Sequence, residues 1–238
     1  MGCTFCATGQ EGFTRNLTPG EIVWQVLCVA ADFGHRVSNV VVMGQGEPFL
    51  NYDNTLAALR ILNHAKGPNV GARHITVSTC GIVDGIRRFG SEPEQFTLAI
   101  SLHAARQSVR DMLMPQVAGT PLDELKAALL DYQHAAGRRV SFEYLMIDGV
   151  NADEADLQAL VDFCDGLSVH VNLLPINAVP ESTYKPCSKV QMQEWITLLG
   201  QAGIEASVRT SRGSDFLGPV GSLRICALKP PTIRPLAA

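Results

Sequence analysis

Short apolar runs alternate with helical patterns along almost the whole chain, and this alternation constrains the fold more than any other feature. The apolar runs have the length and the β-branched content of strands. Between them, apolar residues recur at helical spacing over about 10 to 15 residues. Strands that alternate with helices in this way form βαβ units around a parallel sheet. We therefore expect an α/β fold with roughly six strands.

The expected elements can be placed along the chain from their boundary signals. Thr18 is a helix N-cap with Pro19 and Glu21 just inside, so the first helix begins there and runs to Gly34. The expected strands are 40–43, 74–78, 96–103, 140–147, 170–175 and 205–209. The other expected helices are 54–65, 82–89, 122–136, 155–163 and 189–202.

Composition and charge exclude several classes of protein. Hydrophobic residues make up 46% and charged residues 18% of the chain, which suits a globular domain. The net charge of −4 gives no general attraction for a polyanion, so a nucleic acid would need a local basic patch. No apolar run approaches the ~18 residues of a membrane span. The seven cysteines follow no disulfide framework and indicate a reducing, cytoplasmic compartment.

Polar residues gather where the expected strands end, and the carboxyl ends of parallel strands meet at one edge of a sheet. We therefore expect one site built from several strand tips. The tips are Gly46 and Glu47, Ser78 and Thr79, Ser101 and His103, Asn177, and the stretch 209–215.

Cys3 and Cys6 lie three positions apart in a polar loop at the start of the chain. A turn at this spacing brings both thiols to one metal centre. A redox pair and a chance spacing are the alternatives. Zinc would need four ligands, and neither a second Cys-x-x-Cys nor a His pair provides the other two.

Read together, these motifs resemble the radical S-adenosylmethionine (SAM) superfamily. Within it, the chain is most similar to enzymes that methylate carbon 2 of an adenine in 23S ribosomal RNA and in some transfer RNAs. The matching segments are 2–9, 43–48, 77–81, 101–104, 171–177 and 208–213. The resemblance implies a partial (β/α)6-type radical SAM barrel over residues 1–228, without the family's first strand and N-terminal domain. Residues 229–238, which are rich in proline, are expected to form a flexible tail.

The resemblance also implies two cofactors, a 4Fe-4S cluster and SAM. In the family a Cys-x-x-x-Cys-x-x-Cys loop holds three irons, and Cys3 and Cys6 match its second and third ligands. The first ligand would precede Met1, so the chain is either truncated or derived from a protein that has lost its cluster. We expect truncation, because a missing strand would leave a sheet edge exposed.

The same resemblance assigns the SAM-binding residues. Gly46 and Glu47 match the tip that receives the methionyl ammonium, because glycine allows close approach and a carboxylate suits a cation. The positions that match contacts to the carboxylate, ribose and adenine of SAM are Ser78, Ser101, Leu102, His103 and Asn177. Four of these residues have a structural alternative: Glu47 as an acid at a helix start, Ser78 and Ser101 as satisfied strand-end hydroxyls, and His103 as a packing residue.

One departure from the family bears on the reaction. Val220 stands where the methyl-carrying cysteine belongs, and valine has no nucleophile. Cys226 is six residues further on, ~20 Å away in an extended strand. Cys80 is nearer the expected site but is typical of a small buried side chain. The catalytic residue is therefore unassigned.

The resulting hypothesis is a radical SAM RNA methyltransferase of the cytoplasm. Its implied partners are 23S ribosomal RNA, transfer RNA and an electron donor such as flavodoxin or ferredoxin, with no membrane; its oligomeric state is left open. One alternative is a radical SAM enzyme with a different substrate or outcome, and another is a cluster-free binding relative. Candidate phosphate contacts, or else members of a solvated face, are Arg106, Arg110, Arg138, Arg139, Lys185, Arg209 and Arg212.

Overall fold

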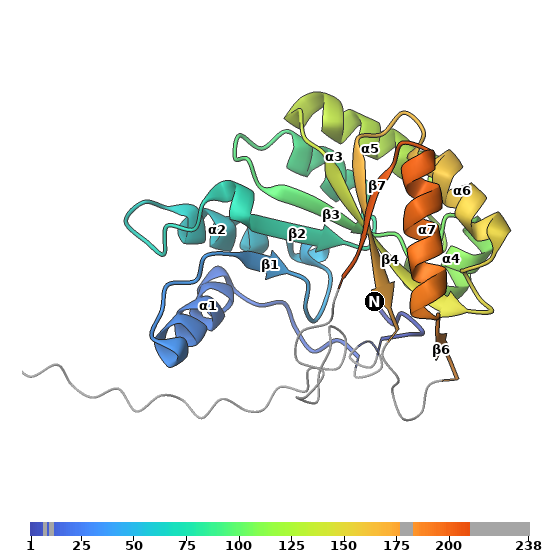
Figure 1. The fold of residues 1–238 in the computed structure, drawn as a ribbon. Helices are drawn as coiled ribbons and strands as arrows, with labels where there is room; N and C mark the ends of the chain where they lie inside the picture. The colour runs from blue at the N-terminus through green and yellow to red at the C-terminus, as the bar shows by residue number, and fades with distance from the viewer. Residues whose placement is uncertain (7–8, 10–11, 177–182, 210–238) are drawn as a thin grey trace, which may run out of the picture.

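The computed structural model describes residues 1–6, 9, 12–176 and 183–209. Its centre is a parallel sheet with the strand order β1-β2-β3-β4-β5-β7 (Figure 1). These strands are β1 Val40–Val42, β2 Ile75–Thr79, β3 Thr97–Ser101, β4 Val140–Asp148, β5 Val169–Pro175 and β7 Glu205–Val208. All six expected strands are therefore present. The short strand β6, Lys185–Pro186, was not expected; it pairs antiparallel with the end of β4.

The parallel strands follow one another across the sheet in the order in which they occur in the chain. The two-residue β6 lies outside this series. Because crossovers between parallel strands are right-handed, a sheet wound steadily in one direction carries its helices on one face. In Figure 1 the helices lie around the outside of a fan of strands. The expected α/β fold, an open partial barrel, is confirmed, and the other face of the sheet is the concave interior.

The six expected helices are all present, with ends within a few residues of their predicted positions. They are α1 Pro19–Phe33, α2 Tyr52–Asn63, α3 Val83–Gly90, α5 Leu122–Ala136, α6 Glu154–Cys164 and α7 Lys189–Gln201. Thr18 and Glu21 form the expected capping box, and Gly34 ends α1 in a left-handed conformation. The sequence did not predict α4, Gln107–Leu113, nor the 3-10 helices η2 Pro48–Asn51, η3 Ala72–His74 and η4 Pro115–Val117.

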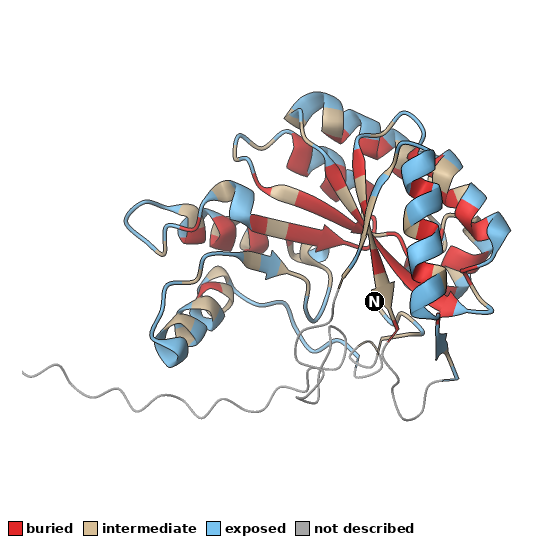
Figure 2. Ribbon diagram, viewed as in Figure 1, coloured by how far each residue is buried: buried red, intermediate tan, exposed pale blue. Residues whose placement is uncertain are grey.

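The two faces of the sheet differ in polarity. Residues such as Val77, Ile100 and Phe142 are fully buried against the helices, and Figure 2 shows the buried residues along the strands and on the helix sides that face them. The alternate residues, which face the interior, include Ser101, Glu143 and other polar side chains described below. The helix-facing side therefore supplies the hydrophobic core, and the interior supplies polar chemistry.

The edges of the curled sheet approach each other across the interior. Arg209, directly after β7, donates a hydrogen bond from Nη1 to the sulfur of Met43, directly after β1, at 3.4 Å. No helix in the described part of the chain is long and apolar enough to cross a membrane.

Candidate functional site

The ends of β2 and β3 meet as expected. The hydroxyl oxygens of Ser78 and Ser101 lie 3.3 Å apart, and Ser78 is buried. The register explains this contact, because β2 and β3 pair in parallel over residues 76–79 and 97–100, just below the two tips. At 3.3 Å the contact is longer than a good O–H···O hydrogen bond, so both hydroxyls retain hydrogen-bonding capacity.

Glu47 joins the loop after β1 to the end of β2. Its Oε1 accepts a hydrogen bond from the backbone N–H of Phe49 at 3.0 Å, and its Oε2 accepts one from Cys80 at 2.8 Å. Glu47 thus caps the 3-10 helix η2, which agrees with its alternative interpretation as an acid at a helix start. Each carboxylate oxygen has a second lone pair, so this role leaves room for a cation. Gly46, at φ 98°, has no heavy atom within 4 Å of an added Cβ, so its backbone is open to close approach.

His103 is a buried residue in a left-handed conformation, with φ 56°. Its Nδ1 accepts a hydrogen bond from the backbone N–H of Leu145 at 3.1 Å, so the ring proton is on Nε2. Burial, followed by the charge of Arg110, lowers the pKa of His103 to about 3, which keeps the ring neutral. Phe5 packs edge-on against the ring at 4.8 Å between centroids. His103 therefore joins the cysteine loop to the ends of β3 and β4.

Two buried polar residues that the sequence did not single out as site supports hold these strand ends. The amide nitrogen of Asn151 donates to the carbonyls of His103 and Leu145, both at 2.6 Å. The guanidinium of Arg110 donates to the carbonyls of Cys80 and Leu102, also at 2.6 Å each. Arg110 is 1% exposed, so it is neither a phosphate contact nor part of a solvated face.

The loop with Cys3 and Cys6 lies against these strand ends. The backbone N–H of Cys6 donates to the carbonyl of Cys3 at 3.0 Å, which closes a turn between the two thiols. Thr4 anchors the loop: its N–H donates to the carbonyl of Leu113 at 3.0 Å, and its hydroxyl contacts that of Tyr184 at 2.8 Å.

Cys3 itself packs against an apolar cluster that contains Cys80, the residue whose backbone N–H donates a hydrogen bond to Glu47. Burial, and then the neighbouring Cys6, raises the pKa of the Cys3 thiol. Burial, and then Glu47, also raises the pKa of Cys80, as expected for a packing residue. The cysteine loop and the tips of β1 and β2 therefore form one neighbourhood.

The donor set can be compared with that of an iron–sulfur cluster. Cys3 and Cys6 offer two soft sulfur ligands from one turn, which fits two of the thiolates that such a cluster uses. Within the described residues, no group of three or more His, Cys, Asp or Glu side chains is arranged to hold a metal ion. Asn177, Arg212, Val220 and Cys226 lie outside the described residues.

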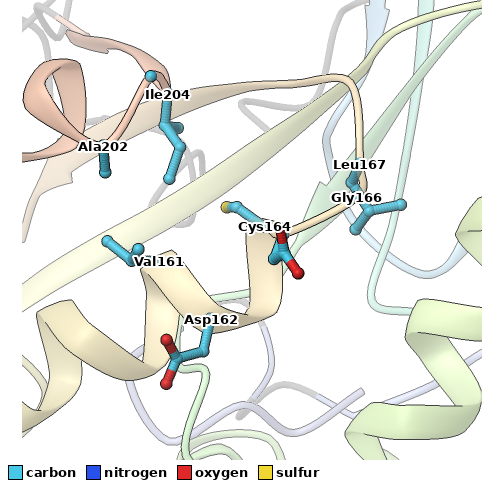
Figure 3. Close-up of a pocket in the computed structure, with 9 residues that line it drawn as sticks. Val161, Asp162, Cys164, Gly166, Leu167, Ala202 and Ile204 are labelled. Carbon is cyan, nitrogen blue, oxygen red and sulfur yellow. The ribbon is translucent and has the colours of Figure 1, made fainter.

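A separate hollow of about 670 Å³ lies at the opposite end of the strands (Figure 3). It is lined by the end of α6, including Val161 and Cys164, and by the turn from α7 into β7, including Ala202 and Ile204. These segments precede β5 and β7, so the hollow is at the amino ends of the strands. None of the expected site residues lines it.

Comparison with known proteins decides the family. The sequence model described as the radical SAM superfamily matches residues 1–163. The chain belongs to the radical SAM superfamily. The match confirms the resemblance to this superfamily that was predicted from the sequence motifs.

Two curated relatives illustrate the similarity of this radical SAM chain to longer proteins. The "Probable dual-specificity RNA methyltransferase RlmN" of Pelotomaculum thermopropionicum is 46% identical over 225 residues, which cover 94% of this chain and 61% of the relative. The protein of the same name from Thermotoga neapolitana is 44% identical, and the matched region covers 94% of this chain and 65% of that relative. The chain thus spans less than two thirds of the length of these relatives.

Solved structures agree. A radical SAM methyltransferase from Sphaerobacter thermophilus matches with a TM-score of 0.90 and 46% identity, over 94% of this chain and 66% of that one. SuiB from Streptococcus suis matches with a TM-score of 0.63 at 15% identity, over 88% of this chain and 46% of that one, and that likeness concerns the fold alone.

Proposed function

We propose that this chain is the core of an RNA methyltransferase that acts on carbon 2 of an adenine in 23S ribosomal RNA, with transfer RNA as a second substrate. The observation that carries this proposal is the 46% identity, over 94% of the chain, to a relative named as a dual-specificity RNA methyltransferase. The TM-score of 0.90 to a radical SAM methyltransferase supports the same reaction class. The cytoplasm is the compartment that fits an RNA substrate and free thiols.

In this proposal Cys3 and Cys6 ligate a 4Fe-4S cluster, and SAM binds beside it at the strand tips. When bound, the cluster supplies the electron that cleaves the sulfonium of SAM; flavodoxin or ferredoxin is the class of donor. Arg110 places a buried positive charge below the tips, and it opposes the rise in the pKa of Cys3. The net pKa of the Cys3 thiol is still raised by burial, so binding of iron would release the thiol proton.

The strand tips bind and orient SAM. Glu47 accepts hydrogen bonds from the methionyl ammonium with its remaining lone pairs, and Gly46 lets that group approach the backbone. Ser78 and Ser101 offer hydroxyls to the carboxylate and ribose. Leu102 and Asn177 complete the adenine and ribose contacts by resemblance. His103 is neutral and held by Leu145, so its part is to position the β3 tip and not to transfer a proton.

Val220 favours a second candidate, a radical SAM enzyme with another substrate or outcome, because valine cannot carry a transferable methyl group. Both candidates predict cleavage of SAM, and only the first predicts methylated adenine.

The deciding experiment begins with anaerobic reconstitution, followed by iron and sulfide counting. The protein is then incubated with SAM, a reductant and either 23S ribosomal RNA or transfer RNA, and the products are measured by mass spectrometry. Formation of 2-methyladenosine supports the first candidate, and 5′-deoxyadenosine without methylated RNA supports the second. A chain that retains no iron and leaves SAM intact contradicts both.

A further inference from the structure

Basic side chains gather at the end of the sheet opposite to the candidate site. The loop 34–39 leads from α1 into β1, and the segment 64–74 leads from α2 into β2, so both lie at the amino ends of these strands. In Figure 1 both segments are at the left of the view, behind the arrows of β1 and β2. We call their six basic residues, all of them exposed, the basic face: His35, Arg36, His64, Lys66, Arg73 and His74.

Acidic residues are missing from the parts of the sequence that form the basic face. No Asp or Glu occurs between Asp32 and Glu47, nor between Asp53 and Asp84, although the chain has 23 acids against 19 lysines and arginines. Even when Asp32 at the end of α1 is counted, the three cations Arg36, Lys66 and Arg73 leave the local charge positive. The basic face is thus a positive region on a chain whose net charge is −4.

The acids at the neighbouring amino end of β3 do not cancel this charge. Glu92 and Glu94 lie just before β3, and both form ion pairs with Arg60, at 2.8 and 2.6 Å. The hydrogen bond from Arg60 also lowers the pKa of Glu94. Both carboxylates are therefore engaged by a cation of α2, and neither forms an ion pair with Lys66 or Arg73.

The side chains of Lys66 and Arg73 form no ion pair or hydrogen bond with any residue that the structure describes; only their backbone groups are engaged. Exposed arginines elsewhere on the surface do pair with carboxylates. These are Arg15, Arg60, Arg87, Arg88, Arg106 and Arg139. The two unpaired cations of the basic face are therefore available to an anion from outside the chain.

Two hydrogen bonds hold the two segments of the basic face together. Nη2 of Arg36 donates to the backbone carbonyl of Asn69, and Nδ1 of His74 donates to the side-chain oxygen of Asn39 at 2.9 Å. The guanidinium of Arg36 keeps other N–H groups for a further partner. Because the segments are already joined, an anion that binds both of them has less chain to order.

We propose that the basic face binds the phosphate backbone of the substrate RNA, at a distance from the nucleotide that reacts. The inference rests on the proposed function, because it adds a second contact to the same RNA. A row of phosphates suits clustered cations that lack counter-ions, since binding releases the ions condensed on the nucleic acid. Contacts to the backbone do not depend on base sequence, so one surface serves both 23S ribosomal RNA and transfer RNA.

The position of the basic face determines which kinetic constant it affects. The five residues of β2 separate this face from the strand tip by about 17 Å, at about 3.3 Å per residue. A contact so far from the tips holds the RNA equally before and during the reaction. Loss of that contact should therefore raise KM for the RNA and leave kcat unchanged.

Binding of RNA to the whole chain at several salt concentrations tests the inference. Filter binding with 23S ribosomal RNA and with transfer RNA, between about 50 and about 200 mM KCl, gives the slope of log affinity against log salt. The double variant Lys66→Gln/Arg73→Gln should bind both RNAs about 10-fold more weakly at the lower salt concentration. Its slope should be smaller by about 2, one for each lost phosphate contact.

Arg87→Gln/Arg88→Gln is the matched control, because it removes the same two charges from exposed side chains of α3 that pair with Asp131 and Asp53. Its RNA affinity should stay within about threefold of that of the unsubstituted chain, with the same salt slope. Circular dichroism verifies that both double variants are folded. Cleavage of SAM without RNA should be equal in both, since neither change touches the strand tips.

Four results would overturn the inference. They are equal RNA affinities in the two double variants, an unchanged salt slope in Lys66→Gln/Arg73→Gln, a fall in kcat with no change in KM, and loss of binding to phosphatidylserine vesicles with RNA binding intact. The last result would assign the face to a membrane surface. If the unsubstituted chain methylates RNA alongside any of these, the inference alone is wrong. If it neither binds nor methylates RNA, the proposed function is wrong as well.

Discussion

Arg110 donates a hydrogen bond of 2.6 Å to the backbone carbonyl of Cys80, and this bond ties helix α4 to the end of strand β2. The same guanidinium donates to the carbonyls of Ser101 and Leu102 at the end of β3. No carboxylate within the described residues forms an ion pair with it. Backbone carbonyls thus take the place of a counter-ion, and one side chain sets the spacing of two strand tips.

Arg110→Met should lower the free energy of unfolding by about 2 kcal/mol, because it leaves buried carbonyls without hydrogen-bond donors. Removal of the desolvated charge partly offsets this loss. Chemical denaturation measures the change. Arg87→Met is the control, since Arg87 forms an exposed ion pair with Asp131 whose loss costs about 0–1 kcal/mol. Equal stability of the Arg110 variant and the unsubstituted chain would contradict the bridging role.

His103 should make stability depend on pH. The pKa of His103 is lowered to about 3 in the folded chain and is about 6.5 when unfolded, so the unfolded state alone takes up a proton as pH falls between these values. Stability is therefore complete above about pH 6.5 and declines below it by up to about 1.4 kcal/mol per pH unit. Denaturation at about pH 7 and about pH 5 measures this contribution.

His103→Asn should remove that contribution, because asparagine tolerates the left-handed backbone and offers an oxygen to the Leu145 N–H but does not titrate. His35→Asn, at an exposed histidine, should keep the pH dependence of the unsubstituted chain. An identical pH profile in the two variants would refute the assignment.

Two glycine-to-alanine substitutions in helices should have opposite effects. A Cβ on Gly85 in α3 would lie 2.6 Å from the buried ring of Phe49, so Gly85→Ala should destabilise the chain by roughly 1–3 kcal/mol. Gly200 in α7 has no heavy atom within 4 Å of an added Cβ, so Gly200→Ala should stabilise by up to about 1 kcal/mol. Thermal unfolding compares the two. A stabilised Gly85→Ala would mean that η2 does not pack against α3 as described.

The two loop cysteines should be required for iron. After anaerobic reconstitution of the chain, Cys3→Ser and Cys6→Ser should each retain less than half as much iron and sulfide as the unsubstituted protein, since each removes a soft sulfur ligand. Cys28→Ser, in α1 and away from the loop, is the matched control and should load normally. Equal loading in all three variants would place the metal elsewhere.

The sheet could be predicted from the sequence because each parallel strand is an apolar run and each long helix has a periodic face. Shorter elements such as α4 and β6 could not be predicted, since their formation depends on tertiary contacts that local propensity does not encode. Ser78 and Ser101 were expected to lie at one edge of the sheet because both stand at the ends of parallel strands, but their direct contact was not predicted.

The supporting residues were harder to predict for a different reason. Arg110 lies in a polar stretch that resembles a surface helix, and only the fold buries it. Asn151 follows a turn, where asparagine is common for local reasons.

The contact of Arg209 with Met43 implies that a side chain, and not backbone pairing, connects the two edges of the open sheet. A guanidinium on a flexible side chain changes rotamer far faster than a strand can shift. The Arg209 side chain therefore controls the access of a small molecule between the β1 and β7 edges. Substituting either residue should therefore alter how quickly a ligand exchanges while leaving the curvature of the sheet as it is.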